Sequence, residues 1–329
     1  MRKSARSTFQ YLLAGIVGCA SLSIVDSSAQ SYPSKPIRVF AHEVGGGNDV
    51  AARLLAPKLS ENVGQPVVIE NRSGAGGSIA TEAVAKSPPD GYTLLILAAS
   101  DTIVAALHPK LPYDLERDFA PVSLVAAGTA VLVVHPSLPA RDVKELIALA
   151  RSNPGKLNYG SSGVGNSSHL MGELFNVMAG VKIVHVPYKG SAGSSAATAA
   201  GEIEMSFPSI VAVGPLLKAG KIKALAVTSA RRNSLMPSLP TIGESGLPGY
   251  DRSTWWGVVA PTGVPREVIV RLQAGIFKAV NTPEVKTAFN RQGLDPQTEP
   301  GTPEQFAAFV RGEIAQSAKL VKLSGAKTD

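Results

Sequence analysis

The sequence predicts an α/β protein with largely parallel sheets, arranged as two lobes that face each other across a cleft. Short apolar runs rich in β-branched residues alternate with amphipathic stretches at helical spacing, joined by short connections containing glycine and proline. The length of 329 residues favours two domains over one hydrophobic core. A strand, a Gly/Ser-rich turn and a helix also recur, in "AHEVGGGNDVAAR", "IENRSGAGGSIATEAVA" and "LNYGSSGVGNSSHLMGELF".

Each expected element follows from this alternation. Apolar runs bounded by turn residues predict strands at Ile37–Ala41, Val67–Glu70, Thr93–Ala98, Val122–Val125, Val131–His135, Leu157–Tyr159, Ile183–Val186, Glu204–Phe207, Lys223–Thr228 and Trp256–Ala260. Helical spacing predicts helices at Asp49–Leu59, Ser78–Lys86, Val143–Arg151, Ser167–Met178, Ala192–Ala200, Val211–Ala219, Arg266–Val280, Pro283–Asn290 and Pro303–Lys322. Pro57 lies inside the first helix, where its missing N–H is expected to kink or shorten it.

The first 29 residues have the composition of a secretory signal peptide. A basic start, "MRKSAR", precedes an apolar core, "FQYLLAGIVGCASLSIV", and small residues offer a cleavage site after Ala29. An alternative stays open, because "IVGC" resembles a lipobox that would leave a lipid anchor at Cys19. Cys19 is the only cysteine, so the mature domains are expected to have no disulfide, cysteine metal site or thiol nucleophile. No later stretch reaches the roughly 18 apolar residues of a membrane span.

The charge pattern argues against nucleic acid as a partner. The net charge is +7, but the basic residues are scattered and aromatic residues make up only 5% of the chain. A nucleic-acid groove normally combines clustered basic residues with stacking aromatics. A mildly positive surface that attracts small anions fits the sequence better.

Three consecutive glycines, Gly45, Gly46 and Gly47, precede the first predicted helix. Asn48 or Asp49 is expected to act as the N-cap and to satisfy one of the free N–H groups there. The remaining N–H groups, aided by the helix dipole, can bind a small anion such as a carboxylate. The alternative is that the glycines only shape a tight turn.

A second turn, "GSSGVGNSSHL" at residues 160–170, concentrates hydroxyl and amide groups at another helix start. These groups either hold a polar end of a ligand or simply cap and solvate a loop. A third turn, "VPYKGS", ends a strand with Tyr188 and Lys189. Lys189 either pairs with a carboxylate in the cleft or is an ordinary surface lysine.

Motifs for catalysis and cofactors are absent or incomplete in the sequence. Gly74-Ala75-Gly76 begins a dinucleotide fingerprint, but Ile79 stands where the third glycine belongs. No nucleophile elbow and no paired-histidine metal motif occurs, so we expect no cofactor and no metal. Among the five isolated histidines, His42 and His169 border the glycine turns and are the better functional candidates.

These pieces, in this order, resemble the substrate-binding proteins of the tripartite tricarboxylate transporter family, also called Bug-type receptors. The resemblance covers nearly all of the mature chain. Its fragments include "YPSKPIRV", "GQPVVIENRSGAGG", "AKSPPDGYTLL", "LPYDLERDFAPVSLVA", "NPGKLNYGSSGVGNSSHLMGELF", "IVHVPYKGS", "AGKIKALAVTSARR", "PTIGESGLPGY" and "WWGVVAPTGVP".

The resemblance implies a periplasmic receptor of the two-lobed, type II periplasmic-binding-protein fold, which performs no chemistry. The first lobe would comprise residues 30–128 and 256–329, and the second lobe residues 129–255, with the signal peptide at 1–29. The receptor would close on a small carboxylate by a hinge motion and pass it to integral-membrane subunits. The implied ligand-binding residues are Val44, Gly45, Gly46, Gly47, Asp49, Ala99, Ser100, Ser161, Ser162, Asn166, Ser167, Ser168, His169, Tyr188, Lys189, Gly190 and Pro208.

Two departures from the family pattern leave the ligand open. The family commonly reads F-P-P-G-G-G-[TS]-D at the first turn, where this chain has Glu43 and Val44 and is one residue shorter. "FPS" at residues 207–209 stands where the family often has F-D-N. Glu43 would repel a second carboxylate or welcome an amino group. Di- and tricarboxylates, amino acids and aromatic acids all remain candidates.

The expected protein is thus a monomeric solute-binding receptor that feeds a tripartite tricarboxylate transporter. One alternative is a secreted α/β enzyme, either an esterase or an NAD-dependent oxidoreductase. Another is a receptor that signals to a membrane sensor, which the sequence does not separate from transport.

Overall fold

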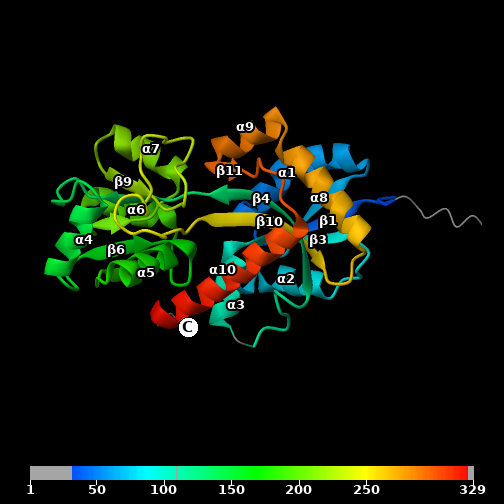
Figure 1. Ribbon diagram of the computed structural model, residues 1–329, viewed down its shortest axis with the longest axis horizontal. Coiled ribbons are helices and arrows are strands. Elements are labelled where there is room, and N and C mark those ends of the chain that lie inside the picture. The colour runs from blue at the N-terminus through cyan, green and yellow to red at the C-terminus, as the bar shows by residue number, and fades with distance from the viewer. Residues whose placement is uncertain (1–31, 109, 325–329) are drawn as a thin grey trace, which may run out of the picture. The chain divides into compact units, whose positions relative to one another are not determined.

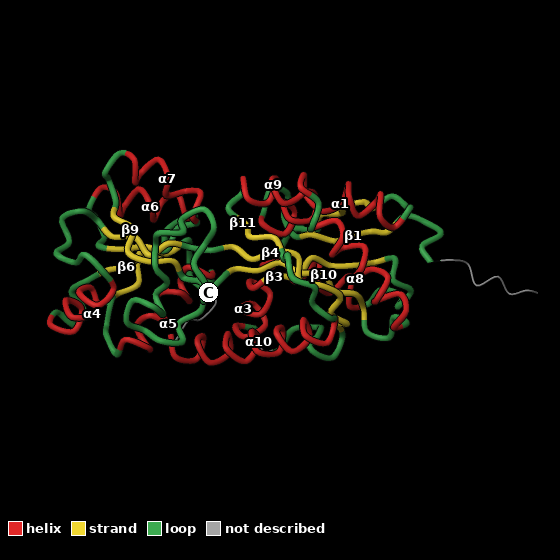
Figure 2. The backbone as a smooth tube through the Cα atoms, turned by 45° about the horizontal axis from the view of Figure 1, so that its top comes forward, coloured by secondary structure: helices red, strands yellow, loops and turns green. Residues whose placement is uncertain are grey.

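A computed structural model describes residues 32–108 and 110–324 of the chain. The expected signal peptide and Cys19 lie outside these residues. Within the described ranges, no helix is long and apolar enough to cross a membrane. From Pro33 onward the chain forms one compact unit that contains two β-sheets (Figures 1 and 2).

The first sheet has six strands in the order β11-β4-β10-β3-β1-β2. Strand β1 pairs in parallel with β2 and β3, whereas β10 runs antiparallel to its neighbours β3 and β4. The strands are β1 (Ile37–Ala41), β2 (Val67–Asn71), β3 (Thr93–Ala98), β4 (Phe119–Gly128), β10 (Thr254–Pro261) and β11 (Leu294–Pro296).

The second sheet has five strands in the order β7-β6-β8-β5-β9. Strand β6 pairs in parallel with β7 and β8, and β5 runs antiparallel to β8 and β9. The strands are β5 (Val131–Val134), β6 (Asn158–Ser161), β7 (Val184–Pro187), β8 (Met205–Ser206) and β9 (Lys223–Val227).

Helices connect the strands and cover the sheets (Figure 2). Those in the chain segments that form the first sheet are α1 (Gly47–Val63), the short 3-10 helix η1 (Ala75–Gly77), α2 (Ser78–Ala85), α3 (Ala99–Leu107), α8 (Arg266–Val280), α9 (Pro283–Arg291) and α10 (Pro303–Ser324). Those in the segments that form the second sheet are α4 (Val143–Ser152), α5 (Ser167–Ala179), α6 (Ser191–Ala200) and α7 (Ile210–Lys218).

The two sheets repeat one local arrangement, which positions the predicted turns. In each sheet the strand next to one edge, β1 or β6, pairs in parallel with both neighbours and is followed by a turn and a helix, α1 or α5. Open α/β sheets bind ligands outside the carboxyl ends of their strands. The three predicted turns follow β1, β6 and β7 and therefore leave from such carboxyl ends.

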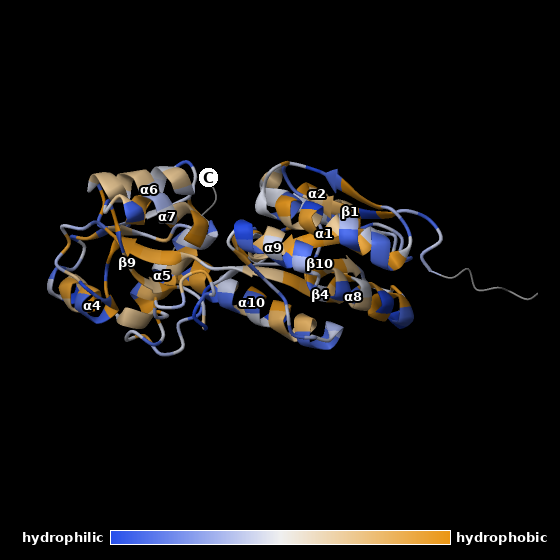
Figure 3. Cartoon of the chain, turned by 90° about the horizontal axis from the view of Figure 1, so that it is seen from above, coloured by the Kyte–Doolittle hydropathy of each residue, from blue (hydrophilic) through white to orange (hydrophobic). Residues whose placement is uncertain are grey.

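The chain passes between the sheets twice, from β4 to β5 and from β9 to β10, and α10 contributes to both hydrophobic cores. Phe306 and Val310 pack in a core with strands of the first sheet, whereas Leu320 and Val321 pack with residues of β5, β6 and α5. Figure 3 shows hydrophobic residues along β4 and β10. Apolar contacts of one helix with both cores thus link the two sheets.

The structure corrects several expectations about secondary structure. Helix α1 continues past Pro57 to Val63, so the proline does not shorten it. Pro57 is exposed, while Leu55 and Leu59 on the buried side pack and sustain the helix. Helix α3 and the short strand β11 were not predicted. Helix α3 follows β3 without any intervening turn residue, so the sequence has no boundary signal there.

Candidate functional site: two matching turns

The first turn follows β1 and begins α1 without a side-chain cap. Gly45 has a φ of +77°, in the left-handed region that favours glycine, and its N–H donates to Asp49 Oδ2 at 2.8 Å. The N–H of Gly46 donates to the carbonyl oxygen of Glu43 at 3.2 Å. Gly46 itself is the N-cap residue, with an ordinary extended conformation.

This geometry leaves three consecutive N–H groups at the start of α1 free. In the described part of the chain, the N–H groups of Gly47, Asn48 and Asp49 have no hydrogen-bond partner. The prediction of Asn48 or Asp49 as the N-cap was wrong. The side chain of Asn48 instead donates to the carbonyl oxygen of Ile96 in β3 at 2.7 Å, which anchors the helix start to the sheet.

Asp49 is buried and braces the turn rather than pointing away from it. Its Oδ1 accepts hydrogen bonds from Arg53 at 2.8 Å and from Asn71 at 2.9 Å, and its Oδ2 accepts from Gly45. Burial on its own would raise the pKa of Asp49, but these hydrogen bonds and the Arg53 charge outweigh it and lower the pKa. The carboxylate is therefore ionised and already occupied by protein donors.

His42 precedes this turn and ties it to α3. Its Nε2 lies 3.2 Å from Asp101 Oδ1, and both side chains are buried. Burial disfavours the imidazolium, but the negative charges of Asp101 and Glu43 outweigh it and raise the pKa of His42. A Cβ atom on Gly77 would lie 2.3 Å from the His42 ring, so the glycine makes room for it.

The second turn, after β6, has the same backbone as the first. Gly165 has a φ of +76°, and its N–H donates to His169 Nδ1 at 3.1 Å. Asn166 is the N-cap residue, and its N–H donates to the carbonyl oxygen of Gly163 at 3.4 Å. Again three N–H groups have no hydrogen-bond partner within residues 32–108 and 110–324, those of Ser167, Ser168 and His169.

The serines of this turn divide into two groups. Ser161 is fully buried, and its hydroxyl contacts the backbone of Gly163 and His185 Nε2, the latter at 2.6 Å. Ser168 accepts a hydrogen bond from the N–H of Ser162 at 2.9 Å. Ser161 and Ser168 thus brace the turn. The hydroxyl of Ser167 makes no hydrogen bond to the described residues and is only partly buried.

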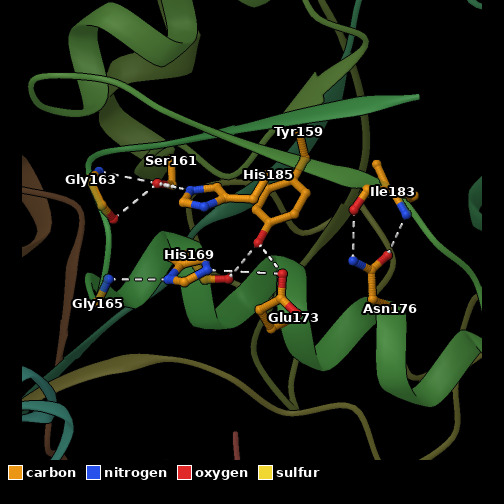
Figure 4. A network of polar contacts seen from close by, with 9 residues as sticks. All are labelled: Tyr159, Ser161, Gly163, Gly165, His169, Glu173, Asn176, Ile183 and His185. Carbon is orange, nitrogen blue, oxygen red and sulfur yellow. Dashed lines mark hydrogen bonds and ion pairs between the residues drawn. The ribbon is translucent and has the colours of Figure 1, made fainter. Parts of the chain in front are cut away.

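The stacked rings of two histidines lie beside the second turn (Figure 4). The rings of His169 and His185 are 3.9 Å apart between centroids, and the Tyr159 ring lies 5.0 Å from that of His185. The Tyr159 hydroxyl donates to Glu173 at 2.6 Å. Burial lowers the pKa of His169 and of His185 to about 4, so both rings are neutral at pH 7. A neutral His169 has the free Nδ1 lone pair that accepts the N–H of Gly165.

The third turn, between β7 and α6, is hydrogen-bonded to the second. The N–H of Tyr188 donates to the carbonyl oxygen of Ser161 at 3.0 Å, and the N–H of Gly190 donates to that of Ser162 at 3.3 Å. Lys189 is exposed and forms no ion pair with the described residues. The structure therefore brings the predicted residues at 161–169 and 188–190 together as one cluster.

Other predicted site residues are less accessible. Ala99 is buried in the core of the first sheet, although Ser100 beside it is half-buried at the start of α3. Pro208 is buried next to β5, where its carbonyl oxygen accepts the N–H of Val131 at 2.9 Å. The side chains of Ala99 and Pro208 therefore pack against protein, and among these positions Ser100 is the one with exposed surface.

Helix α3 is the structural link between the first and second turns. Its N-terminal end pairs with His42 through Asp101, and its last residue, Leu107, lies against the second turn, since a Cβ atom on Gly165 would be 2.7 Å from Leu107 Cδ1. Nine helical residues span about 13 Å. No hydrogen bond or ion pair joins the two turns directly in the described ranges.

Sequence reasoning missed several residues that shape these turns. Arg53 and Asn71 hold Asp49, His185 supports Ser161, and the Trp256 ring would be 2.7 Å from a Cβ atom on Gly47. None is adjacent in sequence to the group that it supports. The Arg53–Asp49 spacing of four residues on a helix is the one local signal that was available.

A cavity of about 790 Å³ lies on the other side of β10. Trp255 lines it, whereas its neighbour Trp256 packs toward Gly47, since successive strand residues point to opposite faces. None of the residues in the three turns lines this cavity. In the described part of the chain, no group of three or more His, Cys, Asp or Glu side chains is placed to hold a metal ion.

Comparisons with known proteins identify the family. The family described as tripartite tricarboxylate transporter family receptor matches residues 51–325. The chain is 38% identical over 303 residues to protein BugT of Bordetella pertussis (strain Tohama I). The aligned region covers 91% of this chain and 92% of BugT.

Two solved structures agree with this match. One is "R. palustris Rpa4515 with adipate", with 38% identity and a TM-score of 0.72, covering 90% of this chain and 99% of that chain. The other is "MatC (Rpa3494) from Rhodopseudomonas palustris with bound malate", with 31% identity and a TM-score of 0.69, covering 88% of this chain and 100% of that chain. Family members are periplasmic solute-binding receptors and not enzymes, which removes the secreted-enzyme alternative. The chain belongs to the receptor family of the tripartite tricarboxylate transporters and has its two-lobed type II periplasmic-binding-protein fold.

Proposed function

We propose that the protein captures a small carboxylate between two lobes and delivers it to the membrane subunits of a tripartite tricarboxylate transporter. The lobes would be residues 30–128 with 256–329, and residues 129–255. The pair of matching turns is the observation that carries the proposal, because each has three N–H groups at a helix start without a hydrogen-bond partner in the described part of the chain. A receptor that signals to a membrane sensor would use the same site.

The energetics of such turns suit a reversible receptor. A hydrogen bond to a charged group contributes about 1.5–3 kcal/mol. Two or three of them, at the positive end of a helix dipole, give a carboxylate useful affinity without a cationic side chain. Adipate and malate in two related structures support a small carboxylate as the ligand class.

Hinge closure and periplasmic location complete the proposal. The crossings between β4 and β5 and between β9 and β10 are the connections about which the lobes would move. The N-terminal segment would direct export and be cleaved after Ala29, leaving a monomeric soluble receptor; lipidation at Cys19 is the alternative.

Native mass spectrometry and calorimetry test this function. The purified protein should carry or bind one small carboxylate per chain, detected first as a co-purified mass and then by titration with a panel that includes adipate and malate. Failure of every aliphatic, amino and aromatic carboxylate to bind, or turnover of any of them, would contradict the proposal. Loss of uptake in a deletion strain, restored by the gene, would separate transport from signalling.

A further inference from the structure

The two turns match in backbone but differ in charge, and from this difference we infer the polarity of the ligand. We infer that the ligand carries one carboxylate, held by the second turn, and that its opposite end, at the first turn, is cationic or neutral rather than a second carboxylate. The inference rests on the proposed function, because it assumes that one ligand contacts both turns.

The backbone of the two turns agrees position by position over six residues. Val44 through Asp49 corresponds to Val164 through His169. The glycines at the second position have φ values of +77° and +76°, and the N-cap residues at the third have ψ values of 167° and 162°. In both turns the side chain at the sixth position, Asp49 or His169, accepts a hydrogen bond from the N–H of the glycine at the second position. Backbone donors therefore do not distinguish the turns.

The first turn carries an acid, Glu43, that forms no ion pair with any described residue. A Cβ atom on Gly46 would lie 2.8 Å from Glu43 Oε1, so the Glu43 carboxylate rests against the N-cap residue of α1. Glu43 is exposed and has no hydrogen bond or ion pair to a described residue through its carboxylate. Asp49 is also negative, although Arg53 compensates it. A ligand carboxylate at this turn would meet the Glu43 carboxylate, which no described residue pairs, while the neighbouring His42 is held by the buried Asp101.

The second turn has the opposite character. Gly163 occupies the position of Glu43, and the acceptor at the sixth position is the neutral ring of His169 instead of a carboxylate. Lys189, on the turn that is hydrogen-bonded to this one, adds a positive charge that has no ion pair with the described residues. Glu173, an acid on α5, accepts a hydrogen bond from Tyr159 and lies 3.9 Å from the Nε2 side of His169, away from the Nδ1 that faces the turn. The second turn is therefore the more favourable carboxylate site.

Exposed valines flank both turns and favour an apolar ligand body. Val44 is 73% exposed and Val164 is 53% exposed, at equivalent positions just before the left-handed glycines. Burial of such side chains against a hydrocarbon chain or ring is favourable, whereas a ligand densely substituted with hydroxyl groups would gain less from them. The chemistry that fits both turns is an amino acid with its amine far from its carboxylate, or a simple monocarboxylate.

Ligands that differ in one end group test which group the first turn accepts. Adipate, 6-aminohexanoate and hexanoate share one carbon chain and differ in the group at one end. The same three end groups can be placed on a four-carbon chain and, at the para position, on a benzene ring. Calorimetry on the purified protein should first show which of the three carbon frameworks binds best. On that framework, the amino compound should bind about tenfold more tightly than the dicarboxylate, and the monocarboxylate should have an intermediate affinity.

The variant Glu43→Gln tests whether the Glu43 charge causes this preference for the amino compound. It should raise the affinity for the dicarboxylate about threefold and lower that for the amino member about threefold, so that their tenfold difference, about 1.4 kcal/mol, falls close to unity. Glu61→Gln is the matched control, because Glu61 is an exposed acid on α1, about 21 Å along the helix from Gly47. This control should leave all affinities unchanged.

The outcomes separate the inference from the proposed function. Equal or tighter binding of the dicarboxylate by the wild type overturns the inference alone, as does a preference for the amine that Glu43→Gln leaves intact. Absence of binding for all nine compounds, together with failure of the wider carboxylate panel that includes malate, overturns the proposed function as well.

Discussion

Asn166→Asp places a negative charge at the N-cap of α5 with almost no change in side-chain volume. Asn166 is exposed, makes no capping hydrogen bond, and donates from Nδ2 to the carbonyl oxygen of Ser162 at 3.1 Å. An aspartate at an N-cap accepts hydrogen bonds from the second and third helical N–H groups. In α5 those groups belong to Ser168 and His169, which we propose hold the ligand carboxylate.

The expected effects on binding and on stability differ in size. Two unit charges 4 Å apart interact by about 1 kcal/mol in water and by about 4 kcal/mol at the effective dielectric constant near a protein surface. The substitution should therefore weaken carboxylate binding by about fivefold to a thousandfold. A good N-cap stabilises a helix by about 0.5–2 kcal/mol, which offsets the lost Ser162 contact, so the free energy of unfolding should change by no more than about 1 kcal/mol.

Calorimetry with a bound carboxylate, together with thermal melts of the ligand-free protein, measures both effects. Asn166→Ser is the control, because it also loses the contact to Ser162 but adds no charge. Its affinity should stay within about threefold of the wild type, well inside one kcal/mol. If Asn166→Asp bound the ligand as tightly as Asn166→Ser, helix α5 would not be the carboxylate site.

Two further predictions concern stability. Glu313→Ala removes the carboxylate that lies 3.0 Å from the Arg252 guanidinium group, which is only 1% exposed, and should lower the free energy of unfolding by about 3–5 kcal/mol in urea titrations. The control Glu304→Ala breaks an exposed ion pair and should lower it by less than about 1 kcal/mol. Equal losses of stability in the two variants would contradict the reasoning. His169 and His185 have pKa values of about 4 in the folded protein and bind protons more readily when unfolded, so stability should fall as pH drops from 6.5 toward 4. In the double variant His169→Gln/His185→Gln, the free energy of unfolding should fall less steeply between pH 6.5 and pH 4. An unchanged pH dependence would mean that other groups cause the loss of stability.

Local sequence predicted the turns well but not every element around them. Runs of glycine, asparagine and serine between a strand and a helix indicated turns with free N–H groups, and the structure has such turns after β1 and β6. Helix α3 escaped prediction because Ala99 continues directly from the buried strand β3. Strand β11 is only three residues long and ends in Pro296, so it has no strand period to detect.

The roles of individual side chains were harder to predict than the backbone. Asp49 was expected as a cap or a ligand contact, yet it accepts hydrogen bonds from Arg53 and from Asn71 of β2. His185 lies 24 residues beyond Ser161 and meets its hydroxyl because β6 and β7 pair in parallel. Such contacts depend on strand register, which a single sequence does not display.

The sequence by itself determined the family and the local backbone of the two turns, because glycines that allow a positive φ and small polar N-cap residues act on their immediate neighbours. The sequence already placed the charge of Glu43 at the first turn, but only the tertiary structure decided which charged groups at each turn are paired and which are not. It laid Glu43 against one N-cap residue and stacked the neutral rings of His169 and His185 beside the other. Charge and burial at a site depend on which distant elements pack around it, and this packing arises only when the sheets assemble.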